Sequence, residues 1–455
     1  MPYQIATAVA LSAIGGLVLV AVGDWRLMLA LMAAGVLVGL GMMRPALLVS
    51  VFVLVRPILD TFSASELGGV SSANPAGALG LLLLGALAVV LAGDRTFFRP
   101  SAMWPFVAVL AVSTTAAAHS LLSLGATIGV KPAGELLRLS VLVGIYLLAA
   151  NLFREPQAAR RLFVLVGLSG VVPAAYGIYE WAAGTVEVLP GYEYSRITGT
   201  FSGPLPFSAY LAVCALVLIS ARDGAMRAWV RLPALALILT ALVRTYSREG
   251  WVIFVIGAIA LLWGRHKAQV VAIAVVVAVV VAAVPTIQAR VFPAETGSSA
   301  GEGFQSYTWR IDNWKGLLAK ASEQPLFGWG LKTTTYVNPR APVRGAGVPG
   351  GGYDAHNTAV RLLVEGGVVL LAVYAILVVV IIGRLRRIQR SRWELQPFAR
   401  TAYWLWVILL VIALTTDDPL EQSATMFAVL ALTGGVEGAY GRWLETREGP
   451  AEGDR

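Results

Sequence analysis

The stretch that decides the fold is residues 270–284, which reads VVAIAVVVAVVVAAV and contains only aliphatic residues. A membrane-spanning strand alternates lipid-facing and polar residues, whereas a membrane-spanning helix is apolar over about 20 consecutive residues. The unbroken run is therefore typical of a helix that crosses a lipid bilayer.

The composition of the whole chain agrees with this interpretation. Of the 455 residues, 57% are hydrophobic and 13% are charged, and the mean hydropathy is +0.74. Ordinary soluble domains contain about 25% charged residues, and a single soluble core stops growing near ~250–300 residues. The composition excludes a soluble enzyme, a disordered chain and a coiled coil. It predicts an all-α protein, a polytopic transmembrane helical bundle of about 12–14 spans.

Apolar runs long enough to approach the thickness of a bilayer recur along the chain. The predicted spans are residues 5–22, 26–43, 45–59, 76–92, 102–118, 136–153, 162–183, 204–221, 229–246, 250–264, 268–287, 357–383, 400–416 and 422–440. The runs 45–59 and 250–264 are short, which leaves re-entrant or half helices open for them. The single cysteine, Cys214, lies inside an apolar run and is predicted to be a buried thiol.

The positions of Lys and Arg predict the orientation. Cytoplasmic loops of membrane proteins carry an excess of basic residues. With the N-terminus inside, the predicted inner loops and tail contain more than half of the 35 Lys and Arg, whereas the outer loop 61–74 contains none. Most of the basic residues behind the net charge of +9 are therefore explained by membrane orientation, and they do not indicate nucleic-acid binding. We expect a protein that crosses the membrane many times, with the long segment 288–356 on its outer face.

The domain organisation follows from these spans. Residues 1–287 are predicted to hold about eleven spans, 288–356 a long outer loop, 357–440 the C-terminal spans, and 441–455 a cytoplasmic tail. Within the outer loop, Ile311, Trp314, Leu317 and Leu318 have helical spacing, which predicts a short amphipathic helix on the outer membrane surface, anchored by Trp309 and Trp314. The glycine-rich residues 345–352 suggest a lid or a linker.

Four side chains stand out because the predicted topology gathers them on the outer face: Arg196, Arg248, Arg310 and His356. Each has a plainer interpretation. Arg196 is typical of a snorkelling arginine at a helix end, and Arg248 of an ion pair with Glu249. Arg310 is typical of a solvated helix face, and His356 of a helix cap. Their joint placement nevertheless points to a site.

The chemistry that fits these residue types is the handling of an anion with one general base. A guanidinium group pairs bidentately with phosphate oxygens and stays charged. A histidine titrates near neutral pH and can take a proton from an attacking hydroxyl. These groups are the minimum for moving a sugar from a lipid diphosphate to an alcohol. Metal assistance is not expected, since the one carboxylate pair, Asp417-Asp418, is typical of a helix cap or an ion pair.

Four pieces of the sequence, in this order, resemble the O-antigen ligase superfamily. They are Arg196-Ile-Thr-Gly-Thr-Phe before a span; Ser247-Arg-Glu-Gly between helices, with Glu249 inserted ahead of the glycine; Arg310-Ile-Asp-Asn-Trp with Pro325-Leu-Phe-Gly-Trp-Gly; and Asp354-Ala-His-Asn with Glu365-Gly-Gly. The superfamily holds ligases and polymerases that use a glycan linked to undecaprenyl diphosphate.

The resemblance implies a metal-independent, inverting glycosyltransferase that needs no cofactor. It also implies a multi-pass protein of the bacterial inner membrane with its active site on the outer face. It implies that Arg196, Arg248 and Arg310 bind the donor diphosphate and that His356 activates the acceptor hydroxyl. We expect Arg244, Asn357 and Asp354 to support them. The expected partners are the undecaprenyl diphosphate-linked glycan, a glycan or lipid acceptor and membrane lipids, with no nucleic acid.

Alternatives remain open at this point. A ligase is favoured over an O-antigen or exopolysaccharide polymerase of the same superfamily, and the acceptor would separate the two. A peptidoglycan polymerase would use a lipid II donor and an acidic residue of an outer loop. A flippase or transporter of lipid-linked glycans would need polar residues along a path through the spans, yet the predicted spans contain few charges away from their ends.

Overall fold

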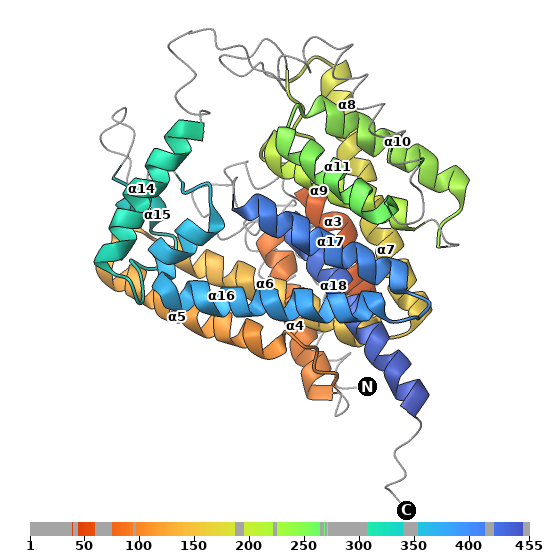
Figure 1. Cartoon of the computed structure of the whole chain (residues 1–455), viewed down its shortest axis with the longest axis horizontal. Helices are drawn as coiled ribbons and strands as arrows, with labels where there is room; N and C mark the ends of the chain where they lie inside the picture. The colour runs from red at the N-terminus through yellow and green to blue at the C-terminus, as the bar shows by residue number, and fades with distance from the viewer. Residues whose placement is uncertain are drawn as a thin grey trace, which may run out of the picture.

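The fold is taken from a computed structural model of the chain (Figure 1). The structure describes residues 44–59, 75–93, 97–186, 195–221, 225–263, 307–339, 354–414 and 423–448, together with residues 39, 268 and 271. In these residues the regular elements are α-helices and one 3₁₀ turn, and there is no strand. The predicted all-α helical membrane fold is confirmed.

The helices fall where the hydropathy predicted them. They are α3 (Pro45–Leu59), α4 (Pro75–Gly93), α5 (Met103–Leu124), α6 (Lys131–Leu152), α7 (Pro156–Ser169), α8 (Val171–Ala182), α9 (Pro204–Ser220), α10 (Ala228–Arg244), α11 (Arg248–Leu262), α14 (Tyr307–Glu323), α15 (Thr334–Val337), α16 (Thr358–Arg390), α17 (Gln396–Ala413) and α18 (Ser423–Glu448), with the 3₁₀ turn η3 at Gly125–Thr127. Among the described residues, five helical stretches are long and apolar enough to cross a membrane: Met103–Leu124, Lys131–Leu152, Pro156–Ala182, Thr358–Arg390 and Gln396–Ala413.

Some predictions lie outside the described residues. These are the spans 5–22, 26–43 and almost all of 268–287, the glycine-rich residues 345–352, the Asp417-Asp418 pair and the side chain of Trp309. Every other predicted span coincides with one helix, except 162–183, which coincides with two. Cys214 is buried, as expected.

One predicted span is broken for a local reason, and two helices are too short to cross a bilayer. The span 162–183 is two helices, α7 and α8, which meet at Gly170. Pro173 lacks an N–H, and its ring conflicts with the carbonyl of Ser169 four residues earlier, so a regular helix ends there. The short helices α3 and α11 each have 15 residues, which span about 22 Å at ~1.5 Å per residue and fall short of a ~30 Å hydrocarbon core.

The described loops gather at two ends of the bundle. At the first, which we call the basic end, ion pairs connect loops that the charge bias places inside. These pairs are Arg154 with Glu445, Arg160 with Glu394 at 3.2 Å, and Arg442 with Glu155 at 3.6 Å. The basic end thus joins the α6–α7 turn, the α16–α17 turn and the end of α18.

The opposite end, which we call the site end, holds the segments predicted to lie outside. The backbone N–H of Leu331 donates to the carbonyl of Ala116 on α5 at 3.1 Å, and Lys131 at the start of α6 donates to the Tyr336 hydroxyl at 2.8 Å. In Figure 1, α14 and α15 lie beside the start of α16 at this end, while α16 runs alongside α5. Residues 307–339 are therefore fixed to the bundle through α5, α6 and α16.

The amphipathic helix predicted in the outer loop is present as α14. Leu317 and Trp314 of its apolar face pack against protein, whereas Leu318 is 43% exposed. Leu317 is fully buried in a small core that contains Ala321, Ala355 and Val364, with Trp314 packed against it. The Trp314 indole donates to the carbonyl of Ala355 at 2.7 Å. The Trp314 side chain is therefore held by protein contacts, and its role as an anchor at the membrane surface stays a prediction.

Candidate functional site

The helix α16 is broken at its tenth residue, Gly367. Gly367 has φ 64° and ψ −164°, so the helix cannot hold its regular hydrogen bonds at this point. The backbone of residues 325–330 pairs with the α16 backbone groups that the break leaves free. Trp329 N–H donates to the Val364 carbonyl at 2.8 Å, Gly330 N–H donates to the Glu365 carbonyl at 2.9 Å, and Val368 N–H donates to the Pro325 carbonyl at 2.8 Å.

This exchange of backbone hydrogen bonds, which we call the α16 clasp, explains two of the sequence motifs. The Pro325-Leu-Phe-Gly-Trp-Gly and Glu365-Gly-Gly segments are partners in space. A broken helix is tolerated at membrane depth only where other groups satisfy its free carbonyls and N–H groups. The clasp satisfies them, and so it fixes the first turns of α16 relative to the outer loop.

His356 lies immediately before α16, and its backbone is held from both sides. Asn357 caps the helix through a hydrogen bond from Val360 N–H to its side-chain oxygen at 3.1 Å. On the other side, Asn313 and Trp314 of α14 donate to the backbone carbonyls of Asp354 and Ala355. His356 itself has φ 47°. The plainer interpretation of His356 as the helix cap is wrong, because Asn357 has that role.

Arg310 shares a helix face with these contacts. Residues three and four apart in a helix are neighbours on one face, so Arg310 lies beside Asn313 and Trp314 on α14. That face packs against the segment that contains Asp354 and Ala355, and Arg310 is half-buried. Arg310 and His356 therefore belong to one group at the site end.

Arg196 belongs to a second group, at the junction of α10 and α11. Its guanidinium Nε donates to the Thr245 carbonyl at 3.0 Å, and the side chain is 6% exposed. The interpretation of Arg196 as a snorkelling arginine is therefore wrong, since its side chain is buried within the protein. Arg248 begins α11 and is exposed, whereas the next residue, Glu249, is buried.

The remaining predicted residue of this junction, Arg244, contacts two aromatic side chains. Its guanidinium carbon lies 3.7 Å from the centroid of the Trp181 ring, and one nitrogen donates to the Tyr246 hydroxyl at 3.3 Å. Tyr246 has φ 49°, which turns the chain between α10 and α11. Arg244 thus fixes the turn that presents Arg248.

A chain of contacts brings the two groups to the same end. The side-chain amide of Asn357 donates to the Leu414 carbonyl just after α17, at 2.8 Å. At the other end of α17, Arg400 donates to the Ala260 carbonyl near the end of α11, also at 2.8 Å. Because α11 and α17 pack side by side in opposite directions, Arg248 lies at the end of α11 nearer to Asn357.

Sequence reasoning missed a buried charged cluster at the site end. It contains Glu135, Arg138, Lys332, Arg361 and Glu365, of which Glu135, Arg361 and Glu365 are no more than 6% exposed. The Arg138 guanidinium donates to the Glu135 carboxylate through Nε at 3.0 Å and through a second nitrogen. The Lys332 ammonium lies 3.6 Å from Glu135, and the Thr334 hydroxyl donates to Glu365 at 2.9 Å.

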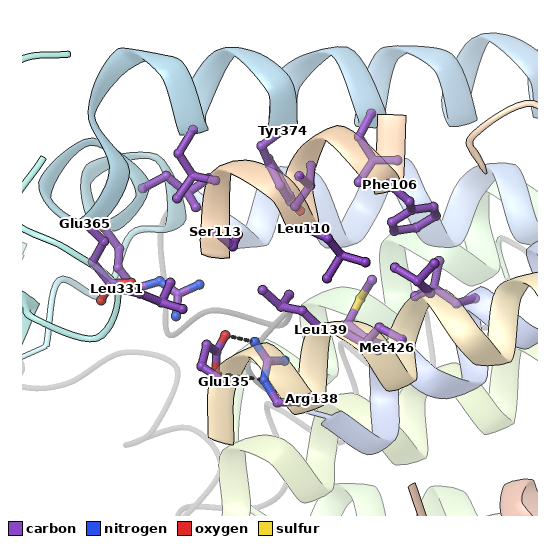
Figure 2. Close-up of a pocket in the computed structure, with 18 of the residues that line it drawn as sticks. Phe106, Leu110, Ser113, Glu135, Arg138, Leu139, Leu331, Glu365, Tyr374 and Met426 are labelled. Carbon is purple, nitrogen blue, oxygen red and sulfur yellow. Dashed lines mark hydrogen bonds and ion pairs between the residues drawn. The ribbon is translucent and has the colours of Figure 1, made fainter. Parts of the chain in front are cut away.

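One signal in the sequence pointed to this cluster. Arg361 and Glu365 lie four residues apart inside a predicted span, and charged residues inside a span usually mark a functional region. Figure 2 shows Glu135, Arg138 and Glu365 at one end of a cavity whose other walls are apolar, with Phe106, Leu110 and Leu139 among them. Helices α5, α6, α16, α17 and α18 all contribute to these walls.

These features define a polytopic α-helical membrane protein with a charged site at one end of its bundle. Residues 233–375 match a family model described as O-antigen ligase, and this match supports the resemblance of the chain to the O-antigen ligase superfamily. The matched region contains Arg244, Arg248, Arg310, His356 and the α16 clasp, whereas Arg196 lies before it. A search of the curated proteins found no match.

The contact between α14 and the residue before His356 gives a local prediction. Trp314→Phe keeps an aromatic ring but removes the indole N–H that binds the carbonyl of the buried Ala355. A buried acceptor that loses its donor costs about 1–3 kcal/mol. We expect a lower midpoint of thermal unfolding in detergent. The control is Trp229→Phe, at a side chain that is 71% exposed on α10. Equal midpoints for the two variants would contradict the prediction.

Proposed function

We propose that this protein is a membrane glycosyltransferase that moves a glycan from undecaprenyl diphosphate to an acceptor hydroxyl, in the manner of an O-antigen ligase. The observation that carries the proposal is the position of His356 within an O-antigen ligase region, at the same end of the bundle as Arg196, Arg248 and Arg310. The charge bias of the loops supports a site on the outer face of a bacterial inner membrane.

In the proposed reaction, the acceptor oxygen attacks the anomeric carbon of the donor sugar while His356 takes the hydroxyl proton. The bond between that carbon and the diphosphate oxygen breaks, and the electron pair leaves with undecaprenyl diphosphate. Attack opposite to the leaving group inverts the anomeric centre. The arginines bind the diphosphate and stabilise the charge that grows on it. Because guanidinium groups supply the positive charge that neutralises the diphosphate, the proposed reaction needs no metal ion.

The α16 clasp and the contacts of α14 support this mechanism through orientation. A general base must lie within hydrogen-bond reach of the proton that it removes, and a small misplacement is costly. Here, the residues flanking His356 are fixed to α14 and to the end of α17. The base is thereby carried on backbone that is held at two points, and it does not depend on one long loop for its position.

The test is a transfer assay with purified protein in lipid nanodiscs. Undecaprenyl diphosphate-linked glycan is the donor, the glycolipid fraction of the producing cells is the acceptor, and EDTA is present throughout. We expect glycosylated acceptor to accumulate at the same rate with and without EDTA, as measured by gel mobility and mass spectrometry. A second lipid-linked glycan, offered as the only acceptor, separates a polymerase from a ligase. Loss of transfer in EDTA that added Mg²⁺ restores would contradict the mechanism.

A further inference from the structure

The stretch that carries Arg196, which we call the Arg196 segment (residues 195–201), has no helix or strand of its own. It lies between α8 and α9 in the sequence. The Ile197 N–H donates to the Arg244 carbonyl at 3.5 Å, beside the bond from Arg196 to the Thr245 carbonyl. The segment therefore meets the junction of α10 and α11. The position of the Arg196 guanidinium depends on what holds this segment against the bundle.

The carboxylate of Glu180, near the end of α8, holds the middle of the Arg196 segment. The Thr198 and Gly199 N–H groups donate to Oε2 of Glu180 at 3.2 and 2.8 Å, and the Thr198 hydroxyl donates to Oε1 at 3.3 Å. Backbone N–H groups outside helices and strands need such partners, since leaving them unpaired away from water is costly. Bonds to an ionised acceptor are stronger than bonds between neutral groups. Both carboxylate oxygens of Glu180 are thus engaged by the Arg196 segment.

The Arg196 segment also fits closely against its neighbours. Gly199 has φ 56°, and an added Cβ would lie 2.9 Å from the carbonyl oxygen of Pro173 on α8. The Thr200 hydroxyl donates to the Pro57 carbonyl of α3 at 2.7 Å. Glu180 is the only charged residue of α8, and its carboxylate binds this segment. A side chain at this position that could not reach the segment would leave its middle without the acceptor that α8 supplies.

We infer that Glu180 is a positioning residue, which acts through Arg196 and sets the affinity of the site for the donor diphosphate. The inference rests on the proposed function, in which Arg196 binds that group. A guanidinium pairs with phosphate oxygens through a rigid planar fork, so a displaced backbone weakens the pairing. Glu180 holds the backbone two residues beyond Arg196, whereas Thr245 holds the guanidinium itself. The role of Glu180 is geometric, and its negative charge takes no part in the reaction.

Two substitutions separate the reach of the Glu180 side chain from its charge. Glu180→Asp keeps the charge but shortens the side chain by one methylene group, about 1.5 Å, which breaks bonds of 2.8 and 3.3 Å. Glu180→Gln loses the charge but keeps the length. Its amide oxygen can accept from both N–H groups, and its amide nitrogen can donate to the Thr198 hydroxyl. We therefore expect Glu180→Asp to impair the site and Glu180→Gln to resemble the wild-type protein.

The measurement is the rate of transfer in nanodiscs, with the lipid-linked donor and the glycolipid acceptor varied in turn. We expect Glu180→Asp to raise the KM for donor about tenfold, which corresponds to ~1.4 kcal/mol. The KM for acceptor should stay within twofold, as should the donor KM of Glu180→Gln. A loss of folded protein would lower the apparent kcat and leave both KM values unchanged. An unchanged donor KM in Glu180→Asp, or an equal rise in Glu180→Gln, would overturn the inference.

Three further variants test the route through Arg196. Glu180→Asp added to Arg196→Ala should cause no further rise in the donor KM, because the side chain that it positions is absent; an additive rise would contradict the inference. Thr198→Val removes one of the three bonds to Glu180 and should raise the donor KM roughly threefold. The matched control is Glu323→Asp, since this carboxylate of α14 is 52% exposed and pairs with Lys320. Its kinetic constants should stay within twofold.

Binding without turnover separates this inference from the proposed function. Undecaprenyl diphosphate carries no glycan to transfer, and its equilibrium binding can be measured by native mass spectrometry in detergent. If the wild-type protein transfers nothing but binds this lipid, and Glu180→Asp weakens binding about tenfold while Glu180→Gln does not, the positioning role stands and the proposed reaction is wrong. If the wild-type protein transfers glycan but Glu180→Asp binds the lipid equally tightly, the reaction stands and the positioning role is wrong. Absence of binding by the wild-type protein would overturn both.

Discussion

His356→Ala is expected to reduce the rate of glycan transfer by about 10²–10⁴-fold, the usual contribution of a general base. The substitution removes the proton acceptor but leaves the backbone hydrogen bonds on both sides, which come from Trp314 and Asn357. The fold should therefore be kept. The measurement is the initial rate of transfer at saturating donor and acceptor, with thermal unfolding in detergent as the check on folding.

The matched control for this variant is His119→Ala. His119 lies near the site end of α5, and no role in the reaction is assigned to it. We expect the control to transfer glycan within twofold of the wild-type rate. A folded His356→Ala protein with near-normal transfer would remove the proposed base, and it would leave the arginines as the only part of the mechanism.

Gly367→Ala is expected to destabilise the protein by at least about 2 kcal/mol, because L residues are strained at positive φ and a close contact adds to this cost. Gly367 has φ 64°, and an added Cβ would lie 2.3 Å from the carbonyl oxygen of Leu326. The oxygen belongs to the backbone of the α16 clasp and cannot turn aside as a flexible side chain would. The readout is the midpoint of thermal or denaturant unfolding in detergent.

The same helix supplies the control for this second prediction. Gly383 also lies in α16, but an added Cβ there meets no atom within 4 Å. Gly383→Ala should leave stability unchanged or raise it by up to ~1 kcal/mol, since alanine is the better helix former. If both variants unfolded at the same midpoint, the α16 clasp would not be a rigid feature of the protein.

The helices themselves could be predicted from the sequence because hydropathy is a local property. Each described apolar run became a helix, and Cys214 is buried as its neighbours indicated. The gathering of Arg196, Arg248 and His356 at one end could also be predicted, since alternate crossings of a bilayer fix the end at which each loop emerges. The lengths of the helices were less predictable, as the break at Gly170 shows.

Only the tertiary structure decided which buried polar groups form hydrogen bonds and ion pairs with one another. The break in α16 at Gly367 depends on donors from residues 329 and 330, which precede their acceptors, Val364 and Glu365, by 35 residues in the sequence. Trp314 binds the carbonyl before His356, and Glu135 meets Lys332 from a distant part of the chain. Buried polar groups must find partners wherever the fold brings them, so pairings between distant segments cannot be deduced from local pattern.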